Sequence, residues 1–89
     1  MVDISLTSKR REQHRRREEK ILEILEASVE PLSVDAIAHM ANVHWLTAKA
    51  IAMELIAEGK ISGMKTSKSW IFGRHDVLTA ATLPREVKN

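Results

Sequence analysis

Cysteine is absent from this sequence of 89 residues. Disulfide bonds and thiolate metal sites are therefore excluded as supports for the fold, and the absence fits a cytosolic protein. No apolar run approaches the roughly 20 residues that cross a bilayer. The basic N-terminus is not followed by the apolar segment of a secretory signal either. We therefore expect a soluble, cytoplasmic protein with no membrane partner.

Signatures of catalysis and of cofactor binding are also missing. The three glycines are widely scattered, which excludes a glycine-rich phosphate loop, and no Ser/His/Asp order or catalytic carboxylate pair occurs. Among the four histidines, His39 follows Asp35 by four residues and His44 lies a little further on. No HExxH motif or second carboxylate at ligand spacing completes a metal site there. We expect no enzyme, no cofactor and no metal.

Charge is distributed unevenly along the chain, although the net charge is only +2. Residues 1–20 hold seven Lys/Arg and four acidic residues, residues 21–59 one and six, and residues 60–75 four and none. The two basic segments suit a polyphosphate partner only if folding brings them to one side. A chain of this length forms one domain with a thin core, which oligomerisation commonly supports, so we expect a homodimer.

The first helix is expected to follow a basic N-terminal segment. No large apolar residue occurs from Lys9 to Lys20, which leaves two alternatives: an exposed extension of the helix, or a flexible arm that becomes ordered on DNA. After this segment, apolar residues recur at helical spacing and predict one core-facing stripe. The stripe consists of Ile21, Leu22, Leu25 and Val29. Pro31 ends this helix because proline disfavours helix at the residue before it.

A short second helix is predicted over residues 34–41. Ser33 is a good N-cap, and Asp35 suits the positive end of the helix dipole. Leu32 and Ile37 have the spacing of a hydrophobic staple.

A third helix follows a tight turn. Asn42 tolerates the left-handed conformation that such a turn requires. The helix begins at Val43, and Gly59 ends it. Its core stripe, at helical spacing, consists of Ala48, Ile51, Ala52 and Leu55.

Beyond Gly59 the apolar pattern becomes β-prone. The runs 60–64 and 69–73 flank the polar turn Lys65-Thr66-Ser67-Lys68, which predicts a hairpin. Trp70 and Phe72 alternate in the second strand and should face the same side. Aromatics in a sheet can stack on single-stranded bases, but we favour core packing of the wing against the helices. Residues 76–89 are expected to form a C-terminal tail, with one or two helical turns before Pro84 and frayed residues after it.

The order of these elements is that of a known family. The stretch LSVDAIAHMANVHWLTAKAIAMELIAEGKI resembles winged helix-turn-helix DNA-binding domains. The resemblance covers residues 21–75 and implies a mainly α fold, a three-helix bundle with a small β-hairpin as the wing. Residues 1–20 are then a basic arm or helix extension, and residues 76–89 a tail.

The resemblance also implies a DNA interface. The third helix of this family enters the major groove, and its outward residues here are His44, Trp45, Thr47, Lys49, Ala50 and Met53. The wing tip would lie along the flanking backbone or minor groove with Lys65, Thr66, Ser67 and Lys68, and Arg74 nearby. Arg10, Arg11, Arg15 and Arg16 of the arm would contact phosphates, and the first two are also candidates for a minor groove.

We therefore expect a double-stranded DNA-binding homodimer of the nucleoid, acting as a transcriptional regulator. A plasmid-partition or chromatin-type binder is a variant of the same class. The third helix has only one lysine and carries Trp45, Leu46 and Met53 outside its core stripe. These residues either pack on the wing or the first helix, or form a protein interface. A protein-interaction module is therefore the alternative.

Overall fold

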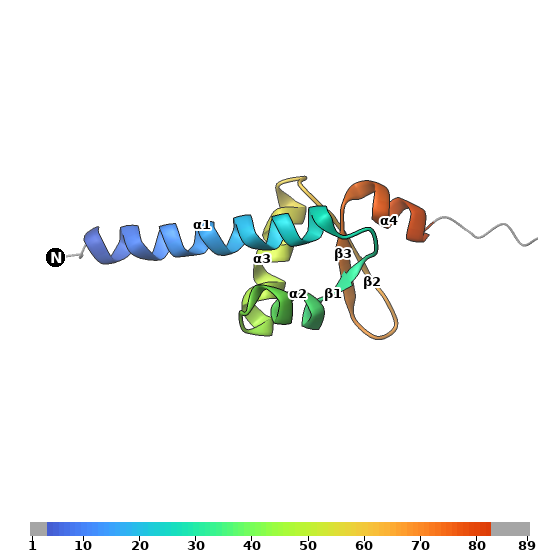
Figure 1. Ribbon diagram of the computed structural model, residues 1–89, viewed down its shortest axis with the longest axis horizontal. Helices are drawn as coiled ribbons and strands as arrows, with labels where there is room; N and C mark the ends of the chain where they lie inside the picture. Colours follow the sequence, from blue (N-terminus) through green and yellow to red (C-terminus); the bar gives the residue numbers. More distant parts are fainter. Residues whose placement is uncertain (1–3, 83–89) are drawn as a thin grey trace, which may run out of the picture.

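The computed structural model describes residues 4–82, with the side chains of residues 9–81 (Figure 1). Within this range the chain forms four helices and one three-stranded antiparallel sheet with strand order β1–β3–β2. The helices are α1 (Ile4–Ala27), α2 (Val34–Ala41), α3 (Trp45–Ala57) and α4 (His75–Thr82). The strands are β1 (Leu32–Ser33), β2 (Ser62–Lys65) and β3 (Trp70–Gly73). The predicted mainly helical architecture with a hairpin is confirmed.

Helix α1 is continuous from Ile4 to Ala27, so the basic segment is an extension of the first helix in this structure. Its N-terminal half projects beyond the other elements (Figure 1). Nearer its C-terminus, Ile21 and Leu25 are fully buried. Val29 was predicted in the same stripe, but 79% of it is exposed. The prediction was wrong because the helix ends at Ala27, where a turn formed by Ser28 with Glu30 breaks the helical spacing.

Helix α2 has the predicted bounds. The Ser33 hydroxyl accepts a hydrogen bond from the Ala36 amide at 3.2 Å and caps the helix. Asn42 adopts the left-handed conformation, with φ 56° and ψ 51°. This turn redirects the chain within two residues because the Val43 amide bonds back to the Ala38 carbonyl at 3.0 Å.

Helix α3 begins at Trp45, two residues later than predicted. Val43 packs against the core instead, and His44 becomes the N-cap. The predicted stripe of Ala48, Ile51, Ala52 and Leu55 is fully buried. It forms one core with fully buried residues of the other elements: Ile21, Leu25, Ile37 and Phe72. Gly59 has φ +76°, which fits the predicted end of this helix.

The β2–β3 hairpin contacts the helical part of the domain in two ways: Gly63 of β2 lies against Ile56 of α3, and β3 pairs with β1, which directly precedes α2. Gly63 pairs with Phe72 in the register, and a side chain on Gly63 would place its Cβ 2.5 Å from Ile56 Cδ1. Strand β1, which was not predicted, pairs with β3 through Leu32 and Phe72. Phe72 is fully buried, and Trp70 lies almost parallel to it with ring centroids 6.0 Å apart. The predicted core packing of these aromatics is thus confirmed.

Helix α4 extends the folded unit past the predicted boundary at residue 75. Val77 and Leu78 are 7% and 4% exposed, so the first residues assigned to a tail pack against the domain. The frayed end predicted after Pro84 lies outside the described residues. None of the helices in the described range has the length and apolar character required to cross a membrane.

Candidate nucleic-acid interface

The tip of the β2–β3 hairpin presents two lysines. Thr66 stabilises the turn itself, because its hydroxyl donates a hydrogen bond to the Ser69 carbonyl at 2.6 Å and accepts one from the Ser69 amide at 3.0 Å. Lys65, Ser67 and Lys68 are exposed. Within residues 9–81, neither lysine forms an ion pair with another side chain. The tip therefore offers two positive charges to a partner.

The outward side of α3 is mostly apolar. His44, Trp45, Ala50 and Met53 are exposed, whereas Thr47 and Lys49 are half-buried. The His44 Nδ1 atom accepts a hydrogen bond from the Leu46 amide at 3.1 Å. In the neutral ring Nε2 then carries the hydrogen and can donate outward.

The beginning of α3 and the hairpin adjoin one hollow of about 360 Å³. We call it the α3–hairpin hollow. Its lining residues come from α2, α3 and the hairpin side: Val34, Asp35, Trp45, Lys49, Ser69 and Trp70. The hairpin loop and the α2–α3 turn lie on the same side of α1 (Figure 1). The fold thus brings the predicted residues of α3 close to the hairpin.

The basic residues of α1 lie elsewhere. Arg16 pairs with Glu12 at 2.7 Å, and Arg15 approaches Glu19 at 4.0 Å. Arg10 and Arg11 are exposed and form no ion pair with the described side chains. The N-terminal half of α1 and the hairpin lie at opposite ends of the described structure (Figure 1). The arginines of the N-terminal half of α1 and the lysines of the hairpin tip are therefore not neighbours, and only an extended partner can contact both.

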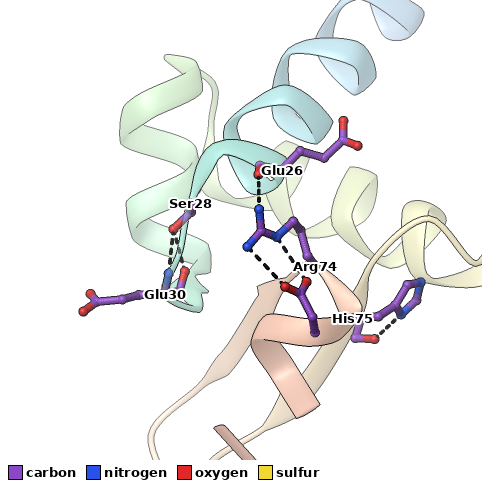
Figure 2. A network of polar contacts seen from close by, with 7 residues as sticks. Glu26, Ser28, Glu30, Arg74 and His75 are labelled. Carbon is purple, nitrogen blue, oxygen red and sulfur yellow. Dashed lines mark hydrogen bonds and ion pairs between the residues drawn. The ribbon is translucent and has the colours of Figure 1, made fainter. Parts of the chain in front are cut away.

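Arg74 has a structural position that the sequence did not indicate. Its guanidinium donates to both Asp76 carboxylate oxygens, at 3.1 and 3.3 Å, and to the Glu26 carbonyl at 3.1 Å (Figure 2). It therefore joins the end of α1 to the start of α4. The tip precedes β3 and Arg74 follows it, so the strand separates them by about 13 Å at its usual rise. Arg74 thus lies one strand length from the tip, and its contact with DNA stays a prediction.

His75, the first residue of α4, contacts the segment that joins α3 to β2. Its Nε2 lies 2.8 Å from the Gly59 carbonyl, and its Nδ1 lies 2.5 Å from the Ser62 hydroxyl. The carbonyl can only accept, so Nε2 donates to it. Through this histidine the start of α4 is tied to Gly59, just after α3, and to the start of β2. Figure 2 draws one of these two contacts.

A polar cluster between α1 and α3 was missed by sequence reasoning. His14 Nε2 lies 2.8 Å from Glu54 Oε2, and Lys60 Nζ lies 3.8 and 3.2 Å from Glu18 and Glu58. Burial and then the nearby Glu58 raise the pKa of Glu18, with Lys60 opposing. The spacing i, i+4 of His14 with Glu18 and of Glu54 with Glu58 was the available signal. The cluster fastens the two helices.

Three residues of this cluster could together hold a metal ion. Ligand atoms of His14, Glu18 and Glu54 lie within 4.8 Å of one another. Asp35, His39 and His44, which the sequence singled out, form no such group in the described range.

No protein-family model, curated protein or solved structure matches the chain.

Proposed function

We propose that this chain is a winged helix-turn-helix protein that binds double-stranded DNA and acts as a transcriptional regulator. The observation that carries the proposal is that Ser69 and Trp70 of the hairpin line the same hollow as the first turns of α3. The tip of that hairpin presents two lysines that form no ion pair with the described side chains. The order of helices, the left-handed turn at Asn42 and the antiparallel hairpin support it. In this proposal α3 is the helix in the major groove and the β2–β3 hairpin is the wing.

The residues then divide by role. Thr47 and Lys49 of α3 face base edges or the nearest phosphates, while Lys65 and Lys68 neutralise flanking phosphates. Arg10 and Arg11 reach phosphates further along the duplex. A homodimer would repeat these contacts with a half-site spacing set by its two-fold axis.

A protein-interaction module is the second candidate because α3 exposes large apolar side chains. Trp45, Leu46 and Met53 are 49%, 56% and 37% exposed. Grouped apolar residues on a small domain commonly mark a contact with another protein. A chromatin-type or plasmid-partition binder remains within the DNA-binding proposal, since it would use the same phosphate contacts.

The test is the salt dependence of binding to a random DNA duplex, measured by fluorescence anisotropy between about 50 and 200 mM salt. Each lost phosphate contact should reduce the slope of log K against log salt by about 0.9. Lys65→Ala and Lys68→Ala should each show this reduction. Lys60→Ala is the matched control, because Lys60 is equally charged but pairs with Glu58 and Glu18.

Two results would contradict the proposal. Absence of binding at the lowest salt would reject DNA binding and favour the protein-interaction module. An equal loss of slope in Lys60→Ala would show that net charge, and not the wing, determines affinity.

A further inference from the structure

The α3–hairpin hollow has the composition of a small-molecule site. Its volume of about 360 Å³ lies within the usual range of ligand pockets, roughly 300–1,000 Å³. Both tryptophans of the chain line it. Trp70 is half-buried and stacked on Phe72, while Trp45 is 49% exposed. Two indoles from different elements supply a large apolar surface with a strong preference for stacked aromatic partners.

The charged residues that line the hollow limit which ligands it can bind. Lys49 comes from α3 and Asp35 from the first turn of α2, and both line the hollow. Neither forms an ion pair with any described residue. A phosphate or another simple anion would meet the Asp35 carboxylate, and a simple cation would meet the Lys49 ammonium. A ligand with one charge of each sign complements both groups.

We propose that the α3–hairpin hollow binds a small aromatic zwitterion of the amino-acid type. The ligand carboxylate pairs with Lys49, its ammonium with Asp35, and its ring contacts Trp45 and Trp70. A bound ligand covers two residues assigned to the DNA interface, so it weakens DNA binding. This regulatory half of the inference rests on the proposed function, whereas binding of the ligand does not.

Ligand binding is tested on the full chain without DNA. The two tryptophans give two indole N–H signals in a proton–nitrogen correlation spectrum, which is titrated with phenylalanine. Phenylacetate and phenethylamine, each with one of the two charges, are titrated in parallel. Both indole signals should shift saturably, and phenylalanine should bind about tenfold more tightly than either analogue, the usual effect of one charged hydrogen bond.

Two variants should remove this preference selectively. Lys49→Ala should bind phenylalanine no better than phenethylamine, and Asp35→Asn no better than phenylacetate. Lys20→Ala and Glu30→Gln, exposed and outside the hollow, should bind the three compounds as the wild type does. The remaining signals of the same spectra show whether each variant is folded. Equal affinity for the three compounds, or no saturable shift of either indole signal, would overturn the inference.

The regulatory half has its own measurement. Phenylalanine should weaken DNA binding by the wild type in the anisotropy assay, and about tenfold more phenylalanine should be needed for the same effect on Asp35→Asn. If the chain binds the ligand but no DNA, the proposed function fails and the ligand site stands. If it binds DNA and no ligand, the ligand site alone fails. DNA affinity that does not change with bound ligand would overturn the regulatory half.

Discussion

Arg74→Ala decides between two roles for one arginine. The sequence assigned Arg74 to the DNA surface, whereas the structure uses it to join α1 to α4 through Glu26 and Asp76. The first role predicts a loss of DNA affinity with normal stability. The second predicts a loss of stability with normal DNA affinity.

The size of the stability loss follows from the contacts. The exposed ion pair with Asp76 contributes roughly 0.2–1 kcal/mol. The hydrogen bond to the Glu26 carbonyl falls in the class of charged bonds worth about 1.5–3 kcal/mol. Because 39% of the Arg74 side chain is exposed, water can hydrogen-bond to the Glu26 carbonyl when the arginine is removed. The hydrogen bond from Arg74 therefore contributes about 1 kcal/mol. A total of about 1–2 kcal/mol corresponds to a fall in melting temperature of roughly 5–15 °C for a domain of this size.

Thermal unfolding by circular dichroism measures this loss, and anisotropy well below the transition measures DNA affinity. Asp76→Asn weakens the ion pair and keeps the bond to Glu26, so it should destabilise less than Arg74→Ala. Arg74→Lys retains the charge but not the planar fork that contacts both partners, and it should recover little stability. The structural role would be refuted if Arg74→Ala melted with the wild type and lost about 0.9 from its salt slope.

Two further substitutions test the packing. Gly63→Ala should lower the free energy of unfolding, measured by urea titration, by about 1–3 kcal/mol. The reason is that the alanine Cβ would lie 2.5 Å from Ile56 Cδ1 and 2.9 Å from Phe72 Cδ1. A variant as stable as the wild type would mean that the hairpin lies further from α3. Glu18→Gln should raise the melting temperature at pH 7 but not near pH 4, because burial raises the pKa of Glu18 above its ordinary 4.5. Ionised Glu18 therefore lowers stability as the pH rises through its folded pKa. Glu19→Gln, exposed and one residue along, is the control, and a gain independent of pH would contradict the explanation.

Local chemistry made part of the fold predictable. Ser33 caps its own helix, and Asn42 forms its turn through neighbours a few residues away. The stripe of Ala48 and Leu55 follows from helical spacing alone. Elements determined by distant partners were missed, since β1 exists only through pairing with β3 and Arg74 bonds to a carbonyl 48 residues earlier.

The candidate site shows the same division. Lys65 and Lys68 were predicted at the hairpin tip because a polar turn between two β-prone runs is a local pattern. The gathering of Asp35, Lys49 and Trp70 around one hollow was not predicted. Trp70 is distant from Asp35 and Lys49 in the sequence, and only the packing of the hairpin against α2 and α3 brings the three residues together.

The continuous helix from Ile4 to Ala27 limits how the basic segment meets a duplex. A helix with its side chains is about 10–12 Å wide, close to the major groove at about 12 Å and twice the minor groove at about 6 Å. Arg10 and Arg11 therefore cannot thread a minor groove as an extended peptide does while the helix persists. The backbone is also already ordered, so contacts by α1 carry no entropy of folding. Calorimetry should accordingly lack the large heat-capacity change of coupled folding and binding.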